Sequence, residues 1–85
     1  MFYVYVLQSI SDGSFYLGST PDLKRRFSEH NEGKNKSTKH TNWNLVYYEA
    51  YLSLAFARKR EATLKRNERM RKLLYDRIKE SLTMV

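Results

Sequence analysis

The chain has 85 residues, so we expect a single domain spanning residues 1–85 with one modest hydrophobic core. Hydrophobic residues make up 41% of the sequence and aromatic residues 14%, a composition that excludes intrinsic disorder. The formal net charge of +7 attracts polyanions, which makes nucleic acid the leading partner ahead of a purely solubilising role. The absence of cysteine excludes disulfides and zinc–cysteine sites and favours a reducing, cytoplasmic compartment.

The first predicted elements form a β-hairpin. Residues 2–10 are β-branched and aromatic with apolar side chains on both parities, which is typical of a central strand covered on both faces. This segment lacks a basic leader and is too short to span a bilayer, so it is neither a signal nor a membrane anchor. Asp12 and Gly13 predict a two-residue turn, and residues 14–18 predict the returning antiparallel strand.

The register of this hairpin decides where two tyrosines lie. A turn symmetric about residues 12 and 13 would pair position 9 with 16 and position 5 with 20, which places Tyr5 and Tyr16 on one face. A one-residue bulge would move Tyr16 to the opposite face. A second interpretation is that these tyrosines are ordinary strand residues, since the chain contains 7 of them.

A helix follows the hairpin. Thr20 at the N-cap, Pro21 at the first helical position and Asp22 near the positive helix end predict its start, and Gly33 predicts its end.

The predicted helix carries an arginine and a histidine beside an apolar stripe. Leu23, Phe27 and His30 recur at helical spacing, with Arg26 one turn before His30, whereas Arg25 is expected to point outward. A guanidinium facing the sheet can bind a phosphate with two parallel hydrogen bonds. The alternative is a snorkelling surface Arg26 and a hydrogen-bonded boundary His30.

The rest of the chain alternates loop, strand and helix. Residues 33–44 have loop composition made basic by lysines, and residues 43–52 return to strand composition. From Ser53 onward the chain lacks Gly and Pro, which predicts helix with an apolar stripe formed by Leu54, Ala57, Leu64, Met70, Leu73, Leu74 and Ile78.

These elements predict an α/β fold with a three-stranded antiparallel sheet in β-β-α-β-α order, flanked by helices. The domain core covers about residues 2–70, and residues 70–85 form a C-terminal helical extension that we expect to pack on its own domain.

Glu61 is the most informative single residue because it occupies a core-facing position of the helical stripe. A buried carboxylate needs a cation, which is either a metal such as Mg²⁺ or Mn²⁺ or an arginine or lysine side chain. Arg58 and Lys65 both lie at helical contact spacing from Glu61. The residues alone leave these two interpretations open.

Several motifs resemble the GIY-YIG nuclease family. The tripeptides Tyr3-Val4-Tyr5 and Tyr16-Leu17-Gly18 are similar to its paired signature, Arg26 lies where its catalytic arginine falls, and residues 61–65 look like its metal-binding glutamate segment. The resemblance covers residues 2–70 and is closest to the short stand-alone bacterial members. The sequence departs from the family pattern at Tyr3, which replaces a glycine, at Leu17, which replaces isoleucine, and at Ser19, where excision-repair relatives often carry lysine.

The resemblance implies a metal-dependent endonuclease that hydrolyses phosphodiesters, with DNA favoured as substrate, no small-molecule cofactor and a monomeric state. It implies that Tyr5 or Tyr16 deprotonates or orients water, that His30 relays a proton, that Arg26 stabilises transition-state charge and that Glu61 binds one Mg²⁺ or Mn²⁺. Contacts to the phosphate backbone are expected from basic side chains, namely Lys34, Lys36, Lys39, His40, Arg58, Arg60, Lys65, Arg66, Arg69 and Arg71.

Two other functions compete with this one. The first is a nucleic-acid-binding module of the same fold with weak or no catalysis, which the missing lysine at Ser19 favours. The second is a protein-interaction adaptor, which the amphipathic C-terminal helix favours.

Overall fold

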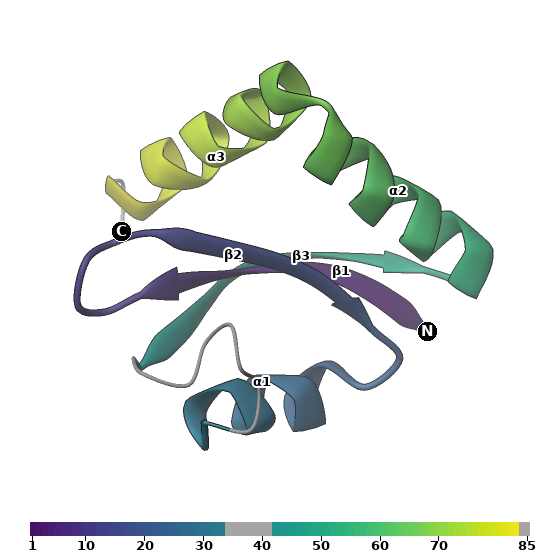
Figure 1. Cartoon of the computed structure of the whole chain (residues 1–85), viewed down its shortest axis with the longest axis horizontal. Coiled ribbons are helices and arrows are strands. Elements are labelled where there is room, and N and C mark those ends of the chain that lie inside the picture. The colour runs from purple at the N-terminus through teal and green to yellow at the C-terminus, as the bar shows by residue number, and fades with distance from the viewer. Residues whose placement is uncertain (34–41, 84–85) are drawn as a thin grey trace.

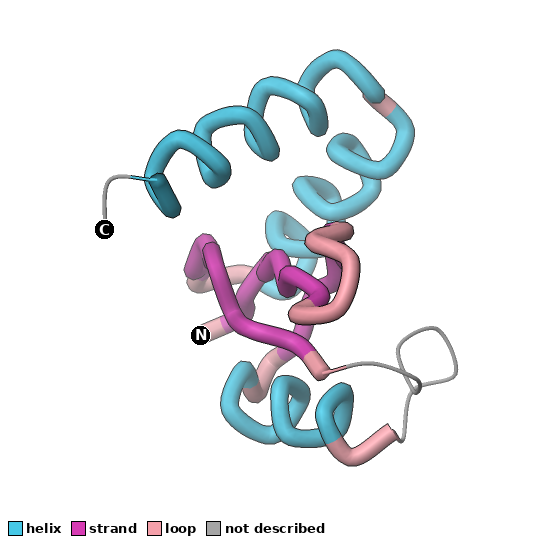
Figure 2. The backbone as a smooth tube through the Cα atoms, turned by 90° about the vertical axis from the view of Figure 1, so that its left-hand side faces the viewer, coloured by secondary structure: helices cyan, strands magenta, loops and turns pink. Residues whose placement is uncertain are grey.

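The computed structural model describes residues 1–33 and 42–83. Within these ranges the chain forms a three-stranded sheet between two helical layers, with α1 on one face and α2 and α3 on the other (Figures 1 and 2). The predicted order of elements and the antiparallel sheet are therefore confirmed. The elements are β1 (Phe2–Ser9), β2 (Phe15–Thr20), α1 (Leu23–Asn31), β3 (Trp43–Tyr51), α2 (Leu54–Arg66) and α3 (Glu68–Thr83).

Strand β1 lies in the middle of the sheet, in the order β2-β1-β3, and supplies apolar side chains to both faces. Val4 and Val6 pack beneath α2 and α3 together with Leu64, whereas Tyr5 and Leu7 pack against the α1 side. All four strand residues are at most 1% exposed. The apolar character on both parities thus predicted correctly that this strand is covered on both faces.

The hairpin register is the first correction. Tyr5 lies opposite Gly18 and Leu7 opposite Tyr16, two residues away from the predicted pairing of positions 5 and 20 and of positions 9 and 16. A two-residue type I′ turn needs positive φ at both central residues, but Asp12 does not adopt it and Gly13 does, at 76°. The loop therefore spans residues 10–13, and the carboxylate of Asp12 accepts hydrogen bonds from the backbone and hydroxyl of residue 14. Because a two-residue shift preserves side-chain parity, both tyrosines still share one face, as predicted.

The start of α1 is the second correction. Asp22, not Thr20, is the N-cap, because its carboxylate accepts a hydrogen bond from the backbone N–H of Arg25 at 3.1 Å. The Thr20 hydroxyl instead accepts a hydrogen bond from the Asp22 backbone N–H, which fixes the entry to the helix. At the other end, Gly33 has a φ of 76°, the conformation that terminates helices, so the predicted end is confirmed.

The helical C-terminal third is interrupted once, at Asn67, whose side chain accepts a hydrogen bond from the Met70 N–H and so begins α3. Leu74 and Ile78 of α3 are buried in the core against the sheet, which confirms that this helix packs on its own chain. Arg71, predicted to contact phosphate, instead donates to the carbonyl of residue 65 at the end of α2. None of the helices in the described ranges is long and apolar enough to cross a membrane.

Candidate active site

Three aromatic side chains predicted for catalysis meet on the α1 face of the sheet. Tyr5 of β1, Tyr16 of β2 and His30 of α1 form a triangle whose ring centroids lie 6.5, 5.8 and 4.9 Å apart. The edge of Trp43 closes this group against Tyr16, with ring centroids 6.2 Å apart. The strand parity and the helical spacing predicted from sequence therefore bring these residues together, although the predicted register was wrong by two residues.

Burial divides the roles of the two tyrosines. Tyr5 is 1% exposed, and its hydroxyl lies 2.8 Å from His30 Nε2. Burial raises the pKa of Tyr5 to about 12, although the neighbouring Arg26 lowers it, so Tyr5 is a neutral phenol near pH 7. Burial and the positive charge of Arg26 lower the pKa of His30, so the imidazole is neutral as well. Tyr16, by contrast, is only partly buried and is therefore the more exposed of the two tyrosines.

Arg26 lies beside this group and lines a cleft of about 320 Å³ together with Ser19 and Thr20. Its side chain is 38% exposed and that of Arg25 is 75% exposed, which confirms that Arg26 faces inward and Arg25 outward. The Tyr5 phenol raises the pKa of the Arg26 guanidinium. Its Nη1 lies 3.4 Å from Glu29, and its buried Nε has no hydrogen-bond partner among residues 1–33 and 42–83.

Glu61 approaches the same edge strand from the opposite layer. It lies on α2, and Ser19 of β2 donates a 2.5 Å hydrogen bond to its Oε1. Lys65 donates to its Oε2 at 2.7 Å, so the predicted alternative of an internal ion pair is present. Burial alone would raise the pKa of Glu61, but the hydrogen bonds from Lys65 and Ser19 outweigh it and lower the pKa. Ser19 thus contacts Glu61 while it lines the Arg26 cleft, which links the two layers at the sheet edge.

Comparison with known proteins assigns the chain to a family. The model of the GIY-YIG catalytic domain matches residues 1–74. The chain belongs to the GIY-YIG family. A UPF0213 protein of Streptococcus agalactiae is 43% identical over 77 residues, covering 86% of this chain and 84% of the relative. A UPF0213 protein of Streptococcus pneumoniae is 40% identical over 74 residues, covering 82% and 72%.

A solved structure agrees with this assignment. The solution NMR structure of a UPF0213 protein from Bacillus halodurans superposes with a TM-score of 0.55 at 34% identity, covering 89% of this chain and 84% of that one. The GIY-YIG catalytic domain places the chain in a nuclease superfamily that acts on nucleic acid.

The structure explains the residue types of the two signature tripeptides of this GIY-YIG chain. Tyr5 and Tyr16 face α1, whereas Val4 and Leu17, the middle residues of the tripeptides, are buried beneath α2 and α3. Gly18 lies opposite Tyr5, and a Cβ built there would lie 2.5 Å from the Tyr5 hydroxyl. The glycine is therefore needed for the close approach of the phenol.

The donor set suits one hard divalent cation. Mg²⁺ is usually bound by one or two carboxylates, with water and substrate phosphate completing its shell. Glu61 supplies a carboxylate that is ionised at neutral pH, and the Ser19 hydroxyl lies next to it. No group of three or more acidic, histidine or cysteine side chains occurs within residues 1–33 and 42–83, so a dedicated protein cage is not formed there. Lys65, half exposed, has room to leave Glu61.

The sequence analysis assigned no positioning role to two residues that have one in the structure. The Asn31 amide oxygen accepts a hydrogen bond from the Trp43 backbone N–H at 2.7 Å, and its amide donates to the Trp43 carbonyl at 3.2 Å. These two bonds fix the end of α1 to the start of β3. From the sequence, Ser19 was noted only because excision-repair relatives often carry lysine at this position. The only sequence signal for the contact between Ser19 and Glu61 is strand alternation, which places Ser19 on the face of the sheet that α2 covers.

The predicted phosphate contacts divide into three groups. The guanidinium of Arg60 is occupied, because it binds Glu49 with two 3.0 Å hydrogen bonds, while Tyr47 and Tyr51 donate to the same carboxylate. Exposed side chains that stay predicted phosphate contacts are Arg58, Arg66, Arg69 and Lys65, the last of which also pairs with Glu61. The predicted ligands Lys34, Lys36, Lys39 and His40 lie outside the described residues.

Proposed function

We propose that this chain is a divalent-metal-dependent endonuclease that hydrolyses nucleic-acid phosphodiester bonds, preferably in DNA, with weak sequence preference. The observation that carries this proposal is the edge strand β2, where Arg26 and the tyrosines on one face lie beside Ser19 and Glu61 on the other. The net charge of +7 supports binding to a phosphate backbone. A monomeric state and a cytoplasmic location belong to the same proposal.

The proton chemistry in this proposal starts at the accessible phenol. Tyr16 orients the attacking water, because it is the more exposed of the two tyrosines and lies against His30. Tyr5 retains its proton near neutral pH and holds His30 and Arg26 in place from behind. The proton released when the water attacks phosphorus passes to neutral His30 through the Tyr16 phenol that lies against it, since His30 itself is fully buried.

Charge stabilisation is assigned to Arg26 and Glu61. The Arg26 guanidinium stabilises the negative charge that grows on the phosphoryl oxygens. The position of its side chain supports this role, because it is 38% exposed and lines the cleft beside Ser19. Glu61 would hold one Mg²⁺ or Mn²⁺, which supplies Lewis-acid stabilisation of the leaving oxygen when bound.

One observation favours the weaker alternative, a nucleic-acid-binding module with little catalysis. Lys65 lies 2.7 Å from the carboxylate assigned to the metal, so its ammonium competes with the cation. Under this alternative the protein binds oligonucleotides but forms no product at any metal concentration.

The test is a cleavage assay with single-stranded, duplex and branched DNA and with RNA, in Mg²⁺, Mn²⁺ or chelator. The wild type should form metal-dependent products, and Glu61→Gln should form none while it still binds. Glu68→Gln, at the exposed start of α3, makes the same change of charge away from the site and should cleave normally. Binding by the wild type without any product would reject the nuclease and retain the module.

The two neighbouring arginines offer a second matched pair. Arg26→Lys keeps the charge but loses the planar guanidinium, so kcat should fall by about 10²-fold or more. Arg25→Lys makes the same substitution at the neighbouring arginine, which lines the same cleft but is 75% exposed, and should change kcat less than about threefold. Equal losses in both variants would show that only general charge, and not the position of Arg26, matters.

A further inference from the structure

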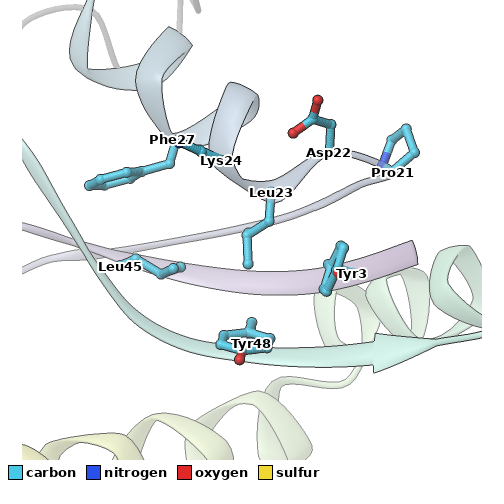
Figure 3. Close-up of a pocket in the computed structure, with 8 residues that line it drawn as sticks. All are labelled: Tyr3, Pro21, Asp22, Leu23, Lys24, Phe27, Leu45 and Tyr48. Carbon is cyan, nitrogen blue, oxygen red and sulfur yellow. The ribbon is translucent and has the colours of Figure 1, made fainter. Parts of the chain in front are cut away.

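An aromatic-lined pocket lies on the α1 face and has no part in the chemistry described above. It encloses about 500 Å³ between α1 and the sheet, within the range of about 300–1,000 Å³ typical of small-ligand sites. Leu23 and Phe27 of α1 form one wall, and Tyr3 and Tyr48 of the sheet form the other (Figure 3). The side chains that line it are therefore mainly aromatic and aliphatic.

One tyrosine of this pocket is largely exposed. Tyr48 is 56% exposed, although it is large and apolar and faces the same side of the sheet as Tyr5. Tyr3 supports it edge to face, with ring centroids 6.0 Å apart. Lys24 lies at the rim and is exposed, so a cation stands beside the aromatic surface. An exposed aromatic ring next to a cation is the combination that binds nucleobases and their phosphates.

The pocket adjoins the cleft of Arg26. Pro21 and Asp22 line both cavities, and Tyr3 lies opposite Thr20, which lines the Arg26 cleft. The one carboxylate at this junction, that of Asp22, is already occupied as the helix N-cap. A nucleotide chain bound at Arg26 by its phosphate therefore has an adjacent base within reach of the aromatic pocket.

We propose that this pocket is a subsite for one unpaired nucleobase of the substrate, stacked on Tyr48, with Lys24 contacting the neighbouring phosphate. The inference rests on the proposed function, because it assumes that a nucleic-acid strand occupies the Arg26 cleft. A paired base cannot enter, since both of its ring faces are covered by stacking within the duplex. The subsite thus favours a substrate that has at least one unstacked base beside the scissile bond.

The test uses a single-stranded oligonucleotide that carries one 2-aminopurine, titrated with the full chain in chelator so that no cleavage takes place. Stacking on a tyrosine quenches the fluorescence of this base. Wild type should quench it, and Tyr48→Ala should weaken binding at least about fivefold and abolish the quenching. Tyr48→Phe keeps the ring and should bind within about twofold of wild type. Phe56→Ala removes another exposed aromatic ring, on α2 at the other face of the sheet, and should change nothing.

Two outcomes overturn the subsite. Tyr48→Ala that binds and quenches like wild type would show that no base stacks there, as would binding of the fully paired duplex with the same affinity and quenching. Cleavage in Mn²⁺ is measured separately, which keeps the two proposals distinguishable. Quenching without any product would reject the nuclease and keep the base subsite, whereas cleavage that is indifferent to Tyr48→Ala would reject only the subsite.

Discussion

Gly18→Ala is the most direct test of how the sheet positions the candidate site. A Cβ at Gly18 would lie 2.5 Å from the Tyr5 hydroxyl and 2.7 Å from its Cζ, about 1 Å closer than ordinary van der Waals contact. The backbone conformation at residue 18 is one that alanine accepts, because φ is positive at Gly13 and Gly33 alone in the described ranges. The expected effect is therefore steric.

The magnitude follows from three terms. Overpacking by one methyl group costs about 1–3 kcal/mol, and loss of the Tyr5–His30 hydrogen bond costs about 1 kcal/mol. Replacement of glycine by alanine returns about 0.4–1 kcal/mol through the unfolded state. We expect Gly18→Ala to lower the free energy of unfolding by about 2 kcal/mol, measured by urea denaturation.

Displacement of Tyr5 should also reduce cleavage beyond what lost stability explains. Gly13→Ala is the control, since it strains a positive-φ turn residue far from the site and should destabilise by about 1 kcal/mol without loss of kcat. The double variant Tyr5→Phe, Gly18→Ala should be less destabilised than the sum of its parts, because the hydroxyl makes the closest contact. A fully stable and active Gly18→Ala would refute this account of the glycine.

Three further predictions concern side-chain contacts. The pKa of His30 is lowered in the folded protein, so the unfolded chain binds its proton first and the free energy of unfolding should decrease as pH falls below about 6.5. His30→Gln should remove this pH dependence in denaturant titrations. The same substitution at the chain's second histidine should leave the pH dependence unchanged. Glu49→Gln should cost about 2 kcal/mol in denaturant unfolding, because it leaves the partly buried Arg60 charge without its partner; an unchanged midpoint would contradict this. Ser19→Ala removes a donor to Glu61 and should raise the Mn²⁺ concentration required for half-maximal cleavage by about tenfold; an unaltered metal requirement would show that Ser19 does not position the carboxylate.

The fold was predictable because local and global signals agree along most of the chain. The apolar residues on both parities of β1 predicted its central place, and the helical spacing of Leu74 and Ile78 predicted the packing of α3. The errors arose where competing local hydrogen bonds decide a boundary. Asp12 and Asp22 each accept a hydrogen bond from a backbone N–H two or three residues ahead. The hairpin loop is therefore longer than predicted, and α1 begins later in the chain than predicted.

The site was only partly predictable for a different reason. Tyr5, Tyr16 and His30 meet through strand parity and helix periodicity, and both of these can be read from a sequence. Pairing between layers cannot be read in this way. The donation from Ser19 to Glu61 and the capture of Arg60 by Glu49 depend on how α2 is seated on the sheet, which no local pattern encodes.

Two neighbouring residues of the edge strand β2 serve the two faces of the sheet. Successive residues of a strand face opposite sides, so Gly18 admits Tyr5 on the α1 face and Ser19, the next residue, binds Glu61 on the α2 face. A one-residue slip of β2 would exchange these two faces and separate the phenols from Arg26. Register is held by Leu17, which is buried beneath α2 and α3 at 5% exposure. The hydrophobic core beneath α2 and α3 therefore fixes which side chains of β2 reach each face of the candidate active site.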